Sequence, residues 1–316
     1  MTTKSIEWFQ SLSTSQVAEI VRERELGTVV FAAGGTKRWF ILNHLDHWPS
    51  DRSYWDGYLE HGGKQFLKIT RLFFEHGVPE LLTHAVIPSQ LAGEGERYLP
   101  LALTSGMERI AASPEFLAFY DECGVRVRFF GNYRQVLQDL DYTDALAMFD
   151  EVEERTCKND RHVLWWGFNS EQDQLTPIIK LAAQYYQEHK VMPDQDQIVE
   201  LYYGEAISPV DIYISFNKPR AWVLPPLIGD RADLYFTVGL SFDFAQRQLR
   251  SILYDHLYAR RGVHRDYAAL SPESFSATQE FYRLNQEAVI GVGHHYEAAH
   301  FWYPLPQVRF PSGWNS

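Results

Sequence analysis

The chain has 316 residues, a formal net charge of −12 at pH 7 and a hydrophobic content of 45%, which predicts a globular protein with a substantial core and excludes disorder. The acidic balance argues against a nucleic-acid partner, because polyphosphate favours a basic protein face. Two cysteines without ligand spacing, and the absence of any run of about 18 apolar residues, predict a cytoplasmic protein with no membrane span.

The first elements predicted along the chain are two helices and two strands. Ser13 is a candidate N-cap that precedes apolar residues at helical spacing, and Val29–Phe31 has the pattern of a buried strand. An amphipathic pattern over Tyr58–Glu75 predicts a long helix, which ends before Gly77. The apolar run Leu81–Ile87 then predicts the next strand.

Strands and helices continue to alternate through the middle of the chain. Tyr98–Tyr120 is mostly helical in pattern, Gly124 ends it, and Val125–Phe130 predicts a strand. The remaining predicted elements are a helix within 144–155, a strand over 162–168, a helix over 175–188, strands over 210–215 and 234–238, and a helix over 244–260. This order predicts an α/β fold with a mostly parallel central sheet and helices on both faces.

The end of the chain differs in composition from the rest. After Arg261 the sequence is less periodic and richer in Tyr, His and Pro. We therefore expect a catalytic domain over residues 1–262 and a C-terminal extension over 263–316, which packs on the core or on a partner subunit.

A glycine pair follows the first predicted strand and leads into a helix. Gly34 and Gly35 allow close approach of an anion, the helix N-terminus presents unpaired N–H groups at Thr36, and Lys37 and Arg38 add positive charge. The combination predicts an anion site suited to a diphosphate. The alternative is a plain strand-to-helix turn with two solvated basic residues.

Several predicted loops should meet at one edge of the sheet, because ligands of open parallel sheets bind beyond the carboxyl ends of the strands. These loops are 34–38, the segment after Ile87, and the turns at 167–169 and 215–222. The aromatic content of 15% is high and would suit a hydrocarbon pocket, although each ring taken alone is readily explained as core packing. The pocket residues that we expect are Trp166, Phe168, Phe216 and Trp222.

Two sets of residues resemble a known family. Gly34-Gly-Thr-Lys-Arg-Trp39 is similar to the phosphate loop of cis-prenyltransferases (undecaprenyl diphosphate synthases), and 209–214 with 232–237 are similar to their late strands. Distributed segments resemble the diterpene synthase branch of that fold, typified by tuberculosinol and kolavelool synthases. These segments are 17–22, 35–40, 74–77, 96–98, 202–205, 234–238, 252–258 and 291–293.

The resemblance implies an enzyme that ionises a bicyclic diterpenyl diphosphate, supplied by a separate class II cyclase. Capture of the allylic cation by water would give a diterpene alcohol of the kolavelool type and release diphosphate. The family's basic pair falls on Lys37 and Arg38, and its site tyrosines fall on Tyr58 and Tyr98. Developing negative charge on the leaving diphosphate would be stabilised by these cations and by backbone N–H groups, and a tyrosine offers a donor and a ring face.

The expected diphosphate site includes residues outside the glycine loop, whereas the expected catalytic residues are only three. Arg97 and Arg220 are further candidate contacts of the diphosphate. The catalytic residues that the resemblance implies are Tyr58, Tyr98 and Arg38. Core packing with a satisfied hydroxyl is the alternative role for each tyrosine.

One departure from the family concerns metal binding. Both families place an aspartate where this chain has Gly34, and in the elongating enzymes that carboxylate helps to hold magnesium on the diphosphate. We therefore expect no protein-held metal, although Mg²⁺ could arrive with the substrate diphosphate. Asp233 occupies the position of a metal-binding glutamate but has no obvious partner carboxylate.

Other functions and clusters stay open at this point. Transfer of the terpenyl group to an acceptor such as adenosine, or a non-catalytic subunit that binds prenyl diphosphates, would also fit the residues. The acidic run 150–154 is more simply a solvated helix face, and His294, His295 and His300 are more simply structural than metal-binding. Related enzymes are homodimers, and we expect the same here.

Overall fold

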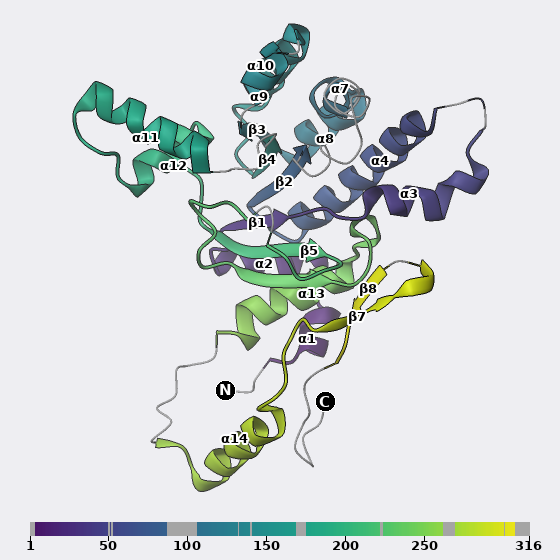
Figure 1. Ribbon diagram of the computed structural model, residues 1–316, viewed down its shortest axis with the longest axis vertical. Coiled ribbons are helices and arrows are strands. Elements are labelled where there is room, and N and C mark those ends of the chain that lie inside the picture. Colours follow the sequence, from purple (N-terminus) through teal and green to yellow (C-terminus); the bar gives the residue numbers. More distant parts are fainter. Residues whose placement is uncertain are drawn as a thin grey trace.

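A computed structural model describes residues 4–49, 51, 53–86, 106–131, 133–139, 141–168, 175–221, 224–261, 269–299 and 301–306. The central sheet has six described strands, all parallel, in the order β3-β4-β2-β1-β5-β6 (Figure 1). The strands are β1 Thr28–Phe31, β2 Glu80–Val86, β3 Val125–Gly131, β4 His162–Phe168, β5 Val210–Phe216 and β6 Asp233–Thr237. Every strand predicted from the sequence is confirmed, with ends shifted by at most one residue.

Helices follow most of the strands, as the alternating pattern predicts. The described α-helices are α1 Ile6–Ser11, α2 Thr14–Glu23, α3 Thr36–His44, α4 Tyr54–Glu75, α7 Met107–Ala112, α8 Pro114–Cys123, α9 Tyr133–Asp139, α10 Thr143–Thr156, α11 Leu175–His189, α12 Gln195–Tyr203, α13 Gln246–Tyr254 and α14 Pro272–Asn285. Ser13 caps α2 as predicted, since its hydroxyl accepts from the backbone N–H of Gln16 at 3.3 Å.

The sheet separates two cores of unequal size. The larger core joins Phe31 and Phe216 of the sheet to residues of α4, α8, α10 and α13. The smaller core joins Val30 and Trp165 of the sheet to Tyr203 of α12. Helices on both faces are therefore confirmed, and the chain reaches the second face mainly through α12.

Two predicted helices differ in detail from the structure. The helix predicted over 244–260 is α13 followed by a π-helical turn at Asp255–Ala259. The segment predicted as helical over Tyr98–Tyr120 begins outside the described residues, and its described part is split into α7 and α8 at Ser113. The split has a local cause: Ser113 caps α8 and Pro114 occupies its first turn.

The C-terminal extension, where it is described, contains a helix and a hairpin that the sequence did not predict. None of the residues of α14 is buried, and β7 Gly293–Tyr296 pairs only with β8 Phe301–Pro304 within the described chain. Figure 1 shows α14 projecting away from the central sheet. The boundary at 262 stays a prediction.

Candidate functional site

The loop after β1 has the geometry of an anion cradle. Gly35 is the N-cap of α3, with a φ of 71° in the left-handed region and no side-chain cap on the helix. A Cβ at Gly35 would lie only 2.7 Å from Cδ2 of Leu240. The loop is tied to the chain after β6, because the backbone N–H of Ser241 donates to the carbonyl of Gly34 at 3.1 Å. Glycine is therefore required at 35, and because it has no side chain it cannot cap the first N–H groups of α3.

This loop lies at the switch point of the sheet. In the sheet, β2, β4 and β3 lie on one side of β1, and the later strands β5 and β6 lie on the other side. Ligands of open α/β sheets bind at this kind of crevice, beyond the carboxyl ends of the strands. The predicted position of the site is thus consistent with the observed topology.

Tyr58 reaches the loop from α4. Its hydroxyl lies 2.9 Å from Oγ1 of Thr36, the first residue of α3, and either oxygen can donate the proton. The Tyr58 ring packs at a steep angle on the buried ring of Phe40, with centroids 6.3 Å apart. The structure therefore brings Tyr58 and the predicted diphosphate loop together.

The two basic residues of the loop differ in exposure. Lys37 is half-buried, and its ammonium lies 5.1 Å from the centroid of the Trp55 ring, whereas Arg38 is exposed. Both follow Gly35 at the start of α3, where the helix dipole favours an anion. The glycine loop and the start of α3 thus bring together the Lys37 ammonium and a helix N-terminus, and the neighbouring helix α4 adds the Tyr58 hydroxyl.

Comparison with curated proteins gives two relatives that match nearly the whole chain. A tuberculosinyl adenosine transferase from Mycobacterium tuberculosis is 33% identical over 90% of this chain and 94% of its own length. A (+)-kolavelool synthase from Herpetosiphon aurantiacus is 27% identical over 90% of this chain and 91% of its own length. The chain belongs to this family of cis-prenyltransferase-like terpene synthases and transferases. No protein-family model matches the sequence.

Two solved structures share the fold of this chain. A probable undecaprenyl diphosphate synthase from Campylobacter jejuni superposes with a TM-score of 0.54 at 16% identity, covering 77% of this chain and 98% of that one. Lavandulyl diphosphate synthase from Lavandula x intermedia superposes with a TM-score of 0.55 at 14% identity, covering 74% and 96%. The predicted cis-prenyltransferase fold is confirmed.

The aromatic residues predicted to form a hydrocarbon pocket lie on the larger core face. Phe216 packs on Phe31 with centroids 5.2 Å apart, and Trp166 packs on Phe66 of α4 at 4.7 Å. Phe168 lies farther along the sheet, among the rings of α9 and α10. All three predicted side chains are buried and serve the core, so their role as a substrate wall stays a prediction.

Other predicted site residues lie at the edge of the described structure or outside it. Tyr98, Arg97 and Trp222 lie outside the described residues. Arg220 is exposed, and its backbone carbonyl accepts from the hydroxyl of Tyr213 at 3.2 Å. Its predicted contact with diphosphate stays a prediction.

Sequence reasoning missed two polar residues beside the loop. Asn217 follows β5 with a φ of 68°, and its Nδ2 lies 3.6 Å from the position that a Cβ on Gly34 would occupy. Ser241 is fully buried, and among the described residues its Oγ has no hydrogen-bond partner. The only sequence signal for Asn217 was its place directly after a strand, within a turn already expected to reach the site.

Position 34 offers no carboxylate to a metal ion, and the expectation that the protein itself holds no metal stays a prediction. Gly34 has no side chain, and the described residues contain no group of three His, Cys, Asp or Glu able to hold a metal. Asp233 is engaged at the opposite, amino end of β6, where it lies 2.7 Å from Nδ1 of His256 and 3.3 Å from Arg260. Asp233 thus belongs to a cluster in which Arg260 pairs with both Asp233 and Asp255.

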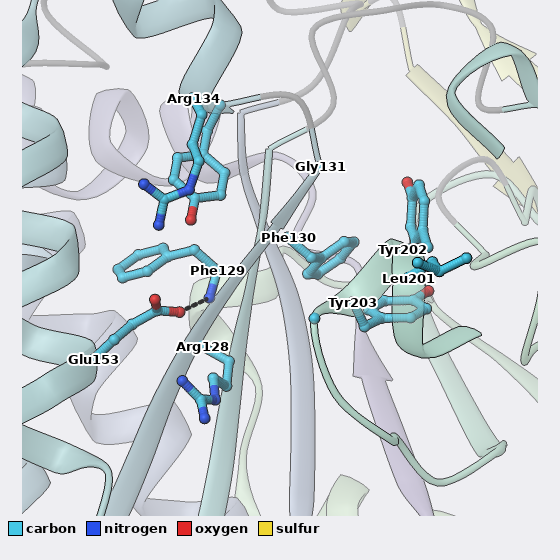
Figure 2. Close-up of a pocket in the computed structure, with 11 residues that line it drawn as sticks. Arg128, Phe129, Phe130, Gly131, Arg134, Glu153, Leu201, Tyr202 and Tyr203 are labelled. Carbon is cyan, nitrogen blue, oxygen red and sulfur yellow. Dashed lines mark hydrogen bonds between the residues drawn. The ribbon is translucent and has the colours of Figure 1, made fainter. Parts of the chain in front are cut away.

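A second hollow, of about 370 Å³, lies at the carboxyl end of the edge strand β3. Figure 2 shows Glu153 with Phe129 on one side of the strand, and Phe130 with Tyr202 and Tyr203 on the other. Glu153 accepts from the backbone N–H of Phe129 at 3.0 Å, and burial raises the pKa of its carboxyl. This hollow was not predicted.

The cations of the second hollow already have anionic partners. Arg128 donates to Glu205 at 2.6 Å, and Arg134 is paired with Asp150. Strand β3 is separated from β1 by β4 and β2, so adjacent spacings of about 4.8 Å place it roughly 14 Å from the glycine loop. The hollow is therefore distinct from the loop site.

Proposed function

We propose that the protein is a diterpene synthase, which ionises a bicyclic, kolavenyl-like diterpenyl diphosphate and captures the allylic cation with water. The allylic C–O bond breaks with its electron pair leaving on diphosphate, water adds to the carbon, and one proton is lost. The products are a diterpene alcohol of the kolavelool type and diphosphate. The observation that carries this proposal is the uncapped α3 N-terminus, with the Tyr58 hydroxyl 2.9 Å from Thr36.

The loop supplies what departure of a diphosphate needs. Negative charge grows on the leaving oxygens, so Lys37, Arg38 and the first N–H groups of α3 lower the barrier by stabilising it. In this proposal the Tyr58 hydroxyl donates to the leaving group and its ring faces the cation. Tyr98 has the same proposed role, and Arg97 and Arg220 extend the diphosphate site.

The proton lost on capture needs no strong base, because a carbocation is a potent electrophile. Released diphosphate or a site tyrosine accepts it in the proposed mechanism. Mg²⁺ would enter with the substrate diphosphate, where it would neutralise part of the charge, and Gly34 itself offers no carboxylate to hold it.

Terpenyl transfer to a small acceptor is the second candidate, supported by the 33% identical adenosine transferase. The chemistry differs only in the last step, since a nucleoside nitrogen in place of water attacks the same cation. A third candidate is a non-catalytic subunit that binds prenyl diphosphates, which the missing acid at position 34 would suit.

A single set of incubations separates the three candidates. The full-length protein is incubated with C15 and C20 diphosphates, including bicyclic C20 substrates, with and without adenosine, and released diphosphate and organic-soluble products are measured. An alcohol without adenosine supports the synthase, and a nucleoside adduct supports the transferase. No product from any substrate would overturn both and favour the binding subunit.

We further propose a cytoplasmic homodimer in which the C-terminal extension contacts the partner. The support is the exposure of large apolar side chains on this extension: Phe275 is 56%, Tyr282 60% and Ile290 87% exposed. Sedimentation of Phe275→Ser/Tyr282→Ser against wild type tests the proposal. A shift from dimer to monomer is expected, and an unchanged mass would refute the role of α14.

A further inference from the structure

The side-chain amide of Asn217 lies directly over the glycine pair. Its Nδ2 is 3.6 Å from the Cβ position of Gly34 and 3.7 Å from that of Gly35, so it borders both residues of the loop. The Cβ of Phe216 lies 3.3 Å from the same position at Gly34. Any side chain at 34 would therefore have to share its space with Asn217.

The backbone at Asn217 is held in an unusual conformation. Its φ of 68° is left-handed, a region that asparagine tolerates better than most residues other than glycine. Its N–H donates to the carbonyl of Thr237 at 2.9 Å, which fixes this turn against β6. Left-handed non-glycine residues cluster at ligand sites, where the surrounding structure maintains them.

A second, independent observation at the same place points to a ligand. Ser241 is fully buried, its N–H is bonded to Gly34, and its Oγ lacks a hydrogen-bond partner among the described residues. Buried hydroxyls in native proteins almost always have a partner, so this hydroxyl is a candidate donor to a bound group. The glycine loop is thus bordered by the Asn217 amide and by the backbone of Ser241, two residues with neutral side chains.

We propose that Asn217 is a ligand of the substrate diphosphate, donating a hydrogen bond from its side-chain amide over Gly34 and Gly35. This inference rests on the proposed function and deepens it, because it states how the diphosphate is held without a carboxylate. In this proposal the Asn217 amide and the Ser241 hydroxyl bind the anion directly, together with the Lys37 ammonium and the N–H groups of the α3 N-terminus. A metal ion bridged by a carboxylate would need the space at 34 that Asn217 and Phe216 border.

Binding of inorganic pyrophosphate to the full-length protein, measured by isothermal titration calorimetry in EDTA and in Mg²⁺, tests the proposal. Asn217→Gly removes the amide and keeps the left-handed backbone accessible. A hydrogen bond to a charged group contributes about 1.5–3 kcal/mol, so Kd in EDTA should rise about 10- to 100-fold. Lys190→Gly is the matched control, since Lys190 has a φ of 62° at the exposed end of α11, and its Kd should not change.

Asn217→Asp separates a direct donor from a metal ligand. The carboxylate has nearly the same shape as the amide but repels the anion, so binding in EDTA should fall further than in Asn217→Gly, with partial recovery in Mg²⁺. If instead wild type binds pyrophosphate only in Mg²⁺ and Asn217→Asp binds as well or better, the amide oxygen is a metal ligand and the proposal is overturned.

The outcomes also separate this inference from the proposed function. Unchanged pyrophosphate affinity in Asn217→Gly, or no binding by wild type, overturns the ligand role. If wild type binds pyrophosphate as expected but no diphosphate substrate gives a product, the proposed function fails while the ligand role of Asn217 is supported. If wild type is active and Asn217→Gly has normal turnover and KM, the ligand role of Asn217 is overturned and the proposed function stands.

Discussion

The carboxyl edge of the sheet carries two polar regions with opposite construction. At β1 and β5, the glycine pair leads into the N-terminus of α3 and is bordered by Asn217 and by the backbone of Ser241, two residues with neutral side chains. At β3, the arginines of the second hollow are matched by nearby carboxylates. The glycine loop also offers the backbone N–H groups of a helix N-terminus, which attract an anion, so we expect it to suit an anion better than the hollow, whose arginines are bound to carboxylates.

The largest expected effect is removal of the half-buried cation of the loop. Lys37→Ala should lower turnover of a diterpenyl diphosphate by about 100- to 1,000-fold, because one donor to a developing anion typically contributes that much. Released diphosphate is the measurement. Lys180→Ala, an exposed lysine on α11, is the control and should behave as wild type. A fall of less than threefold in Lys37→Ala would remove the loop as the site of ionisation.

A second prediction concerns protonation beneath the β3 hollow. His84 lies on β2 with its ring 5.8 Å from Phe130, and burial lowers its pKa to about 4 from the usual 6.5. Because the unfolded chain then takes up the proton first, stability is complete above about pH 6.5 and is lost as pH falls toward 4. The loss from this residue is on the order of 3 kcal/mol.

Chemical denaturation between pH 7.5 and 4.5 measures this dependence. His84→Gln removes the titrating group, so its unfolding free energy should vary less with pH than that of wild type. His76 and His162 have lowered pKa values for the same reason, burial, and will keep part of the slope. An identical pH dependence in His84→Gln and wild type would show that His84 is not buried as a neutral ring.

The third prediction tests whether the loop requires glycine for shape. Gly35→Ala places a side chain at a φ of 71° and 2.7 Å from Leu240, so both strain and crowding should destabilise the protein by about 2 kcal/mol and weaken pyrophosphate binding. Gly204→Ala has a similar φ of 83° with no atom within 4 Å of its Cβ position. This control should lose only about 1 kcal/mol and keep its affinity. Equal losses of affinity in both variants would contradict a specific role for the loop.

The parts of this site that follow a strand could be predicted from sequence, because local pattern determines them. The buried run before Gly34 and the basic pair after it mark a strand, a turn and a helix start, and the structure has these in order. The place of Tyr58 came from family resemblance, and its contact with Thr36 spans 22 positions in the chain. Such a contact depends on how α4 packs and has no local sequence signal.

Other features depended on strand order, which the sequence pattern did not specify. Asn217 borders Gly34 because β5 pairs with β1, although 182 positions separate Thr28 from its partner Val210 along the chain. The β3 hollow joins α10 and α12, which pack on opposite faces of the same edge strand. The exposed extension lacked a clear helical period because α14 has no buried face.

The fourth prediction refines the role of the tyrosine on the loop. Tyr58→Phe removes the hydroxyl bonded to Thr36 and keeps the ring, so turnover should fall about 3- to 10-fold, as expected for one neutral hydrogen bond. Tyr254→Phe is a suitable control, since its hydroxyl donates to the Lys4 carbonyl far from the loop. Unchanged turnover in Tyr58→Phe would show that the hydroxyl has no role in turnover, and only the ring of Tyr58 could then contribute.

The smallest effect is expected in the second hollow. Arg134 and Asp150 form an ion pair whose side chains are 51% and 56% exposed, and such surface pairs contribute little to stability or to anion affinity. Arg134→Ala should therefore change pyrophosphate affinity and turnover by less than twofold, whereas Arg38→Ala in the loop should weaken binding clearly. If Arg134→Ala weakened pyrophosphate binding tenfold or more, the hollow at β3 would bind the anion, and the helix N-terminus of the glycine loop would no longer distinguish the two regions.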